Sequence, residues 1–345
     1  MVVLEERIKS SLKDRRMNSN IMIRFPFVIV SFALLILSSI VNAEDLSERS
    51  PEQWLKVMQR ASVNENYRGI FMFSRGEMSS SMSIVHRFQN DEEQELLKQL
   101  DGEMGEIVRR GSEVMCVFPD NRVVQLEQSN YSNKVVQTFA SFMPEQQNYQ
   151  LKNFGPCRQV ERPCVKLSIE AQDQHRYSYF LWLDKQTGLL LKSVLQNHEG
   201  VDLERFQYTQ LEFPATINDA DLAPMNEGSL VEHVMIPTAK KDLQWPREIM
   251  WQSRWVPPGF KKISGENKIG ENVMVYSDGL ANYSIFVEKI QEGMMPEGAS
   301  QVGATVAYAQ VLKFNSHPYS VTVIGEVPAM TAMLVAESVK PLLSK

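Results

Sequence analysis

The chain has 345 residues, of which 43% are hydrophobic and 23% charged, and its formal net charge is −6. These values are typical of a folded protein of one to three domains, without low-complexity tracts. They exclude a chain that needs disulfides or metal to build a core. The negative charge disfavours nucleic acid as a partner.

The N-terminal residues have the pattern of an export signal. Arg24 precedes an apolar run at 25–40, and Val41-Asn42-Ala43 supplies small residues for cleavage. The run is short for a membrane span, which needs ~20 residues, although an uncleaved anchor is the alternative. We predict a signal peptide at 1–43, with Met1 or Met17 as its start. Its removal takes six Lys/Arg and three Asp/Glu, which moves the net charge from −6 to −6 − 3 = −9.

The first predicted element is a helix that begins after Ser50. Ser50 and Gln53 suit a capping box, and Pro51 suits the first helical position. Short apolar runs between polar turns then predict a mainly antiparallel sheet of about nine strands. Two further helices are expected within this sheet domain, at 92–100 and around 135–142. The expected strands are 67–74, 82–89, 105–111, 112–118, 121–127, 149–154, 164–170 and three runs within 177–213.

The second half of the chain predicts a separate, smaller unit. Residues 215–245 are rich in small, polar and Pro residues, which is typical of a linker. Beyond them, apolar runs predict strands at 273–277, 283–290, 305–314 and 319–325, and a final helix after Pro328. This pattern predicts a small α+β domain whose helix covers one face of an antiparallel sheet.

Two of the three cysteines stand in a suitable arrangement for a disulfide. Cys157 and Cys164 are seven positions apart and flank a predicted hairpin turn. An exported chain permits a bridge, which would stabilise the fold by ~2 kcal/mol. Two free thiols are the alternative. Cys116 lies in an apolar strand and is interpreted as a core residue.

The sequence lacks the patterns that support catalysis or metal binding. There is no GxSxG motif, no Cys with a nearby His and no phosphate-binding Gly loop. His86 alternates with apolar residues, so we interpret it as a sheet-surface or cavity residue rather than a ligand. Glu92-Glu93 is interpreted as a solvated face rather than an acid–base pair. We therefore expect no enzyme, no cofactor and no metal.

Several strands are apolar on both faces and therefore need cover on both sides. In YRGIFMF at 67–73 and FLWL at 180–183, both alternating sets of side chains are apolar. A curved sheet wrapped around helices would enclose an apolar space suited to acyl chains; a fully packed core is the alternative. Arg109-Arg110 at a strand end could meet a phosphate or acidic partner, or could be simply solvated.

These stretches resemble one family. YRGIFMF after a Trp/Leu helix, LLKQLDGEMGEIVRRGSEVMCVFPD, and LWLDKQTGLLLKS with LERFQY are similar to the N-terminal half of the periplasmic sigma-E regulators RseB and MucB. WVPPGF, VYSDGLANYSIFVE and VTVIGEVPAMTAMLVAESV resemble the C-terminal domain of that family. The resemblance covers nearly all of the chain after the signal peptide; the segment 1–16 and Cys157 depart from it.

The resemblance implies an α+β fold. Its first domain would be an antiparallel β half-barrel with helices in its mouth, similar to the carrier LolA, followed by the smaller C-terminal α+β domain. It also implies a periplasmic negative regulator that binds the periplasmic part of a membrane anti-sigma factor of RseA/MucA type and shields it from site-1 proteolysis. Lipopolysaccharide or lipoprotein acyl chains would release it. A lipid or lipoprotein carrier of LolA type is the alternative, and a homo-oligomer is left open.

The expected boundaries are 44–214 for the half-barrel, 215–245 for the linker and 246–345 for the C-terminal domain. The expected sites follow from strand alternation and from the resemblance. For the lipid we expect inward-facing Phe71, Phe73, Phe88, Phe180, Trp182 and Leu191. For the anti-sigma partner we expect Tyr276, Asp278, Tyr283, Phe286, Tyr319, Arg109 and Arg110.

Overall fold

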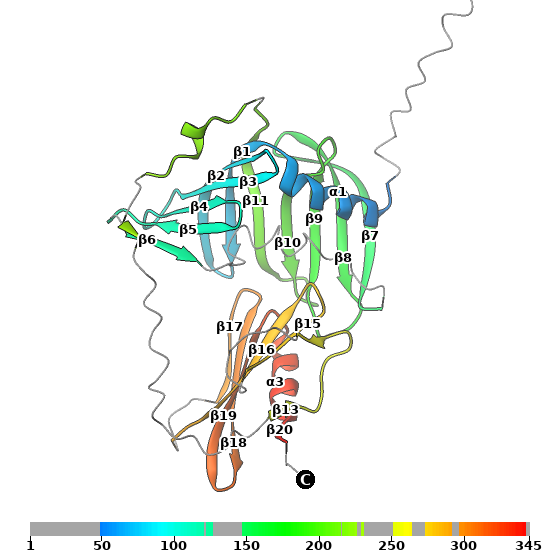
Figure 1. Ribbon diagram of the computed structural model, residues 1–345. Coiled ribbons are helices and arrows are strands. Elements are labelled where there is room, and N and C mark those ends of the chain that lie inside the picture. Colours follow the sequence, from blue (N-terminus) through cyan, green and yellow to red (C-terminus); the bar gives the residue numbers. More distant parts are fainter. Residues whose placement is uncertain are drawn as a thin grey trace, which may run out of the picture. The chain divides into compact units, whose positions relative to one another are not determined.

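A computed structural model gives the fold, and it describes residues 49–120, 122–126, 147–214, 216–225, 229–230, 251–263, 273–291 and 297–342. The predicted signal peptide at 1–43 and the predicted helix around 135–142 lie outside these residues. Of the helices in the described ranges, none combines the length and the apolar character that spanning a bilayer requires. The described residues form a twelve-stranded sheet, a six-stranded sheet and a two-stranded pair, and each of the two larger sheets has its own hydrophobic core (Figure 1).

The N-terminal sheet contains twelve strands among the described residues, in the order β12-β6-β5-β4-β3-β2-β1-β11-β10-β9-β8-β7. All neighbours are antiparallel except β12 and β6. The two end strands, β12 and β7, are not paired with each other, so the sheet is open, and the predicted antiparallel half-barrel is confirmed. The strands are β1 (Tyr67–Arg75), β2 (Met78–Gln89), β3 (Glu92–Gln99), β4 (Glu106–Arg110), β5 (Glu113–Val117), β6 (Arg122–Leu126), β7 (Tyr149–Gln159), β8 (Arg162–Ala171), β9 (Ser178–Asp184), β10 (Leu190–Gln196), β11 (Asp202–Glu212) and β12 (Ser229–Leu230).

The helix predicted at 92–100 is wrong, because Glu92–Gln99 forms the strand β3. Its residues Glu, Gln, Leu and Lys favour helices, but pairing with β2 and β4 on both sides overrides that local preference. The turn that precedes β3 contains the feature that indicates a hairpin rather than a helix. Asn90 and Asp91 both have positive φ, at 55° and 61°, as a two-residue hairpin turn requires.

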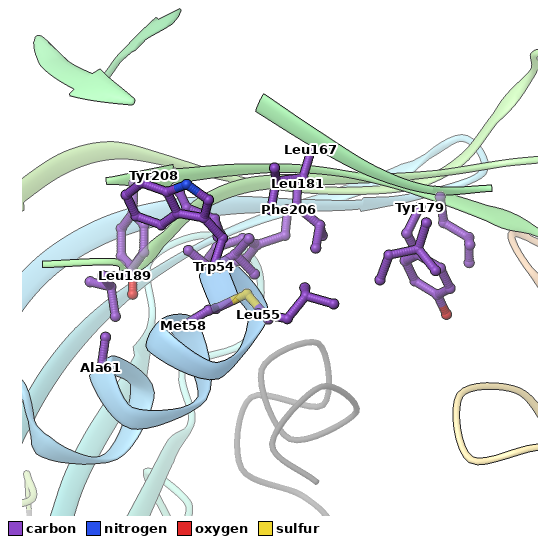
Figure 2. Close-up of a cluster of buried hydrophobic side chains, with 14 of the residues drawn as sticks. Trp54, Leu55, Met58, Ala61, Leu167, Tyr179, Leu181, Leu189, Phe206 and Tyr208 are labelled. Carbon is purple, nitrogen blue, oxygen red and sulfur yellow. The ribbon is translucent and has the colours of Figure 1, made fainter. Parts of the chain in front are cut away.

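Helix α1 (Pro51–Asn64) begins at the predicted capping box, in which Ser50 accepts from the Gln53 amide and the Gln53 side chain accepts from the Ser50 amide. Its apolar face buries Trp54, Leu55 and Met58. Figure 2 shows these side chains beside residues of the sheet. One helix thus covers part of the inner face of the sheet.

At β3 and β4, the opposite face of the sheet is also covered by a segment of the chain. Leu96 and Val108 belong to a second hydrophobic cluster, together with Ile217 and Leu222. Ile217 lies just before the short 3-10 helix η1 (Asp219–Leu222), and Leu222 is its last residue. Arg87 fixes this segment, because it donates to the Ile217 carbonyl at 2.9 Å and pairs with Asp219 at 2.6 Å. The start of the predicted linker is therefore packed on the first sheet.

The C-terminal unit has a six-stranded antiparallel sheet in the order β14-β15-β16-β19-β18-β17 and a separate β13–β20 pair. Helix α3 (Ala329–Ser338) packs on β18 and β19 and buries Ala332, Val335 and Ala336. This confirms the small α+β unit with a terminal helix. The strands are β13 (Trp251–Ser253), β14 (Lys261–Lys262), β15 (Val273–Ser277), β16 (Asn282–Lys289), β17 (Gly298–Val302), β18 (Thr305–Phe314), β19 (His317–Gly325) and β20 (Val339–Pro341).

The β7–β8 hairpin contains the Cys157–Cys164 disulfide. The two cysteines are directly opposite each other in the antiparallel pair, and the turn between the strands is Val160-Glu161, both with positive φ. Cys116 is a free thiol in β5.

Candidate functional site

The inner face of the N-terminal sheet is filled by side chains of α1 where that helix crosses it. Trp54, Leu55 and Met58 share one cluster with Leu181 and Phe206, all 2% exposed or less. In Figure 2 the helix side chains lie directly against Leu181 and Phe206. This part of the inner face is a packed core.

The outer face of β7, β8, β9 and β10 presents aromatic rings and ammonium groups. Lys166 Nζ lies 5.2 Å from the ring of Phe154, 5.4 Å from Phe180 and 5.0 Å from Trp182, and Lys192 Nζ lies 4.6 Å from Trp182. Both lysines are cross-strand partners of Trp182. We call these five residues the aromatic–lysine patch.

The patch combines an apolar surface with positive charge. Phe154 is 52% exposed, and the other four side chains are half-buried. Burial, followed by the charge of Arg205, lowers the pKa of Lys192 from its usual value. An amphiphile with an anionic group would satisfy both the ring faces and the ammonium groups.

A buried charge cluster joins the N-terminal sheet to the C-terminal unit. Arg176, in the segment between β8 and β9, has no exposed side-chain surface. Its Nη1 lies 2.5 Å from Asp278 Oδ2, it also pairs with Asp173 at 3.0 Å, and it donates to the Pro258 carbonyl. The Tyr149 hydroxyl donates to the same Asp278 oxygen at 2.9 Å. We call this group the Arg176 cluster.

Asp278 holds its own turn as well as Arg176. Its Oδ1 accepts from the amides of Leu280 and Ala281, at 2.9 and 2.8 Å, in the turn between β15 and β16. Burial, followed by the charge of Asp278, raises the pKa of Tyr149 well above its usual value, so its phenol stays a proton donor. One carboxylate therefore holds both its own turn and a contact between the two units.

A second contact lies beside the cluster. His175 Nδ1 is 3.1 Å from the Thr331 hydroxyl at the start of α3, and its ring meets Trp255 edge-on at 5.2 Å. Gly259 lies against Asn148, since a Cβ at Gly259 would fall 2.2 Å from Asn148 Nδ2. The segment between β8 and β9 and the residue before β7 thus contact three separate parts of the C-terminal unit.

Comparison with known proteins identifies the two units. Residues 50–226 match the sequence model of the MucB/RseB N-terminal domain, and residues 246–340 match that of the MucB/RseB C-terminal domain. The chain belongs to the MucB/RseB family.

Curated relatives match over nearly the whole chain. The sigma factor AlgU regulatory protein MucB of Pseudomonas aeruginosa is 33% identical, over 89% of this chain and 96% of its own length. The sigma-E factor regulatory protein RseB of Haemophilus influenzae is 29% identical, over 91% of this chain and 97% of its own length.

Solved structures of the family agree with the fold. A crystal structure of MucB in complex with MucA(peri) is 32% identical, with a TM-score of 0.66, and covers 86% of this chain and 100% of that one. A crystal structure of MucB, with a TM-score of 0.55 and 30% identity, covers 84% of this chain and 97% of that one.

The MucB/RseB fold places the expected lipid residues on two different faces. Phe71 and Phe73 lie in or against the core beneath α1, Leu191 is fully buried and Phe88 is half-buried. The expected inward orientation of Phe180 and Trp182 is wrong. Their neighbours Leu181 and Leu183 face the core, so Phe180 and Trp182 face outward. The alternation of side chains could not predict which residues of this strand point inward, since both of its faces are apolar.

Three residues expected to bind the partner are instead internal. Tyr283 has no exposed surface and stacks on Tyr276 at 5.1 Å in the C-terminal core. Asp278 is held in the Arg176 cluster. Aromatic residues in a short strand are as typical of a core as of a binding surface, so the sequence could not separate the two.

The other expected partner residues retain some exposure. Phe286 and Tyr319 are half-buried, with Tyr319 lying 5.0 Å from the ring of Trp251. Arg110 is exposed, whereas Arg109 is 11% exposed and pairs with Glu93 at 3.2 Å. Their binding role remains a prediction.

The sequence reasoning missed Arg176, Lys166 and Lys192. The two lysines had a usable signal, because Lys166 stands between Val165 and Leu167 and Lys192 follows Leu190 and Leu191, so each interrupts an apolar run and marks a face that is not core. Arg176, in the polar segment QDQHR, had none.

Proposed function

We propose that this protein is a periplasmic, non-enzymatic negative regulator of a sigma-E-type envelope stress response. It binds the periplasmic segment of a membrane anti-sigma factor and shields that segment from its first protease. The observation that carries this proposal is the match of both units, in order, to a MucB chain that was crystallised in complex with MucA(peri). The predicted signal peptide at 1–43 supports the compartment.

Regulation requires that the signal and the anti-sigma segment favour different states of the protein. The Arg176 cluster suits this requirement, because its contacts between the two units converge on one guanidinium and one carboxylate. Separation of Arg176 from Asp278 would leave two buried charges without their partner unless water enters. In this proposal the intact and the broken cluster are the two states that the signal and the anti-sigma segment favour.

The signal in this proposal is a lipid, either lipopolysaccharide, which is an anionic amphiphile, or the acyl chains of a lipoprotein. The aromatic–lysine patch supports it, since three rings and two lysines share one outer face. A lipid held there would place its acyl chains against the ring faces and its anionic group against the two ammonium groups.

The test is calorimetric titration of the purified protein with the periplasmic segment of the host's anti-sigma factor, with and without lipid A. We expect tight binding that weakens when lipid A is present. A matched pair of variants locates the coupling: Arg176→Lys breaks the forked contacts of a buried arginine, whereas Arg158→Lys changes an exposed one. Arg176→Lys should change the effect of lipid A, and Arg158→Lys should not.

Failure to bind the anti-sigma segment in either condition would refute the regulator. If the protein then bound lipid A alone, the LolA-type carrier would be the better account. Binding of the segment that lipid A leaves unchanged would keep the partner and remove the lipid signal.

A further inference from the structure

Three ligand-type side chains meet on the inner face of the N-terminal sheet, beside the end of α1. His86 on β2 and Glu95 on β3 are cross-strand partners, and Glu93 lies two residues from Glu95 on the same face. One nitrogen or oxygen from each lies within 4.8 Å of the others. His86 Nε2 is 3.2 Å from Glu93 Oε1.

The His86 ring is held in one orientation. Its Nδ1 lies 2.8 Å from the backbone carbonyl oxygen of Glu65, the residue that ends α1. A carbonyl only accepts, so Nδ1 carries a proton. Nε2 faces the Glu93 carboxylate, to which it donates while the ring is protonated, and it presents its lone pair on that side once a metal ion displaces the proton. Tyr67 stacks on the ring at 4.9 Å. This is how metal-binding histidines are oriented in proteins, with the second ring nitrogen donating to a carbonyl.

Glu95 supplies the second, independent observation. It is 4% exposed, and its buried Oε1 has no hydrogen-bond partner. A buried carboxylate oxygen without a partner is costly, and a bound cation removes that cost. Glu93 is held differently, because Arg109 contacts its Oε2 at 3.2 Å and leaves Oε1 directed at His86.

Charge and distance both suit a small divalent cation. Glu93 and Glu95 bring two negative charges against the one positive charge of Arg109. At metal–ligand distances near 2.0–2.1 Å, two ligands of a tetrahedral zinc ion are about 3.3 Å apart, close to the 3.2 Å between His86 Nε2 and Glu93 Oε1. The third ligand atom can close on the ion by side-chain rotation. Glu93, whose side chain is 25% exposed, provides the entry side.

We propose that His86, Glu93 and Glu95 bind a divalent transition-metal ion, with zinc as the best fit to one imidazole and two carboxylates. The ion would tie β2 and β3 to the carbonyl end of α1 through His86. It would thereby stabilise the helix against the sheet. The site is separate from the aromatic–lysine patch and the Arg176 cluster, so a test of the metal site does not depend on the proposed function.

The experiment is a zinc titration by calorimetry, on protein stripped with EDTA and purified without a histidine tag. The test variants are His86→Gln and Glu95→Gln, which keep side-chain size, and the matched control is Glu92→Gln, an exposed carboxylate on the same strand. We expect one zinc per chain. Both test variants should weaken binding by roughly tenfold or more, because even the loss of a group that only orients a metal ligand costs about 10–100-fold, and Glu92→Gln should leave binding unchanged.

Nitrogen NMR of the unmodified protein keeps the test independent of variant folding. Zinc should shift Nε2 of His86 and leave its Nδ1 protonated. Three results would overturn the proposal: no binding up to millimolar zinc, binding that neither test variant weakens, or binding with the His86 ring nitrogens unchanged.

Discussion

Arg176 Nη1 lies 2.5 Å from Asp278 Oδ2, and neither side chain exposes any surface. The two residues are 102 positions apart in the sequence and come from different domains of the MucB/RseB family. An ion pair removed from water is of uncertain net benefit, but the loss of one partner leaves an uncompensated buried charge. The pair therefore makes each unit dependent on the presence of the other.

Removal of either charge should strongly destabilise the protein. We expect Arg176→Met or Asp278→Ala to cost roughly 3–5 kcal/mol, seen as a lower urea midpoint of tryptophan fluorescence. Asp278→Ala should cost more, because Asp278 also accepts from two amides of its turn. The double variant should cost less than the sum of the two single changes.

The exposed Arg158 provides the control, since Arg158→Met should leave the midpoint within about 0.5 kcal/mol of the parent. Additive effects of Arg176→Met and Asp278→Ala would contradict the pairing. Equal costs for Arg158→Met and Arg176→Met would show that burial of the guanidinium is unimportant.

Gly259 and Gly155 form a matched pair, because both have φ of +83° but only Gly259 touches a neighbour. A Cβ at Gly259 would lie 2.2 Å from Asn148 Nδ2 and 2.6 Å from its Cγ, whereas a Cβ at Gly155 meets nothing within 4 Å. Gly155→Ala should cost about 1–2 kcal/mol from backbone strain. Gly259→Ala should cost about 1–3 kcal/mol more from overpacking. Equal thermal shifts for the two variants would mean that Asn148 moves aside freely.

Much of the fold could be predicted from the sequence, because the fold depends on local patterns. The capping box at Ser50, the alternating strands and the hairpin turns are properties of neighbouring residues. The helix predicted at 92–100 failed for the opposite reason. Residues such as Glu92 and Leu97 prefer helices locally, and only the strands on either side make them a sheet.

The sites were harder to predict because they depend on which face or domain a residue meets. Leu181 and Trp182 are both apolar, so nothing in FLWL says which one faces α1. Glu93 and Glu95 join His86 only once β3 is a strand, and the expectation of a helix there concealed that cluster. The partner of Arg176 lies in another domain, beyond the reach of any spacing rule.

The capping box of α1 should make a measurable, pH-dependent contribution. Ser50 Oγ accepts from the Gln53 amide at 3.3 Å and donates to Glu52 Oε2 at 2.7 Å. Ser50→Ala should cost about 1 kcal/mol by thermal unfolding at pH 7. Ser79→Ala, an exposed serine in β2, is the control and should be neutral.

The hydrogen bond from Ser50 lowers the pKa of Glu52 below its usual value. A carboxyl whose pKa is lower in the folded state stabilises the fold above its unfolded pKa, near 4.3. That contribution disappears as the pH falls through the folded pKa. The difference between the parent and Ser50→Ala should therefore narrow between pH 5 and pH 3. A constant difference would mean that only the Gln53 amide bond matters.

Leu181 and Trp182 are adjacent in β9 but face opposite sides of the sheet, so they separate folding from ligand binding. Leu181 has no exposed surface and packs in the core with α1, and Leu181→Ala should cost about 2–5 kcal/mol. Trp182 lies between Lys166 and Lys192 on the half-exposed outer face. Trp182→Ala should lower stability far less than Leu181→Ala and reduce co-sedimentation with anionic phospholipid vesicles several-fold.

Added salt should weaken the binding of the parent protein to the vesicles, because the lysine contribution is screened. Undiminished vesicle binding by Trp182→Ala would remove the patch as the lipid site, and unfolding as severe as that of Leu181→Ala would make Trp182 a core residue.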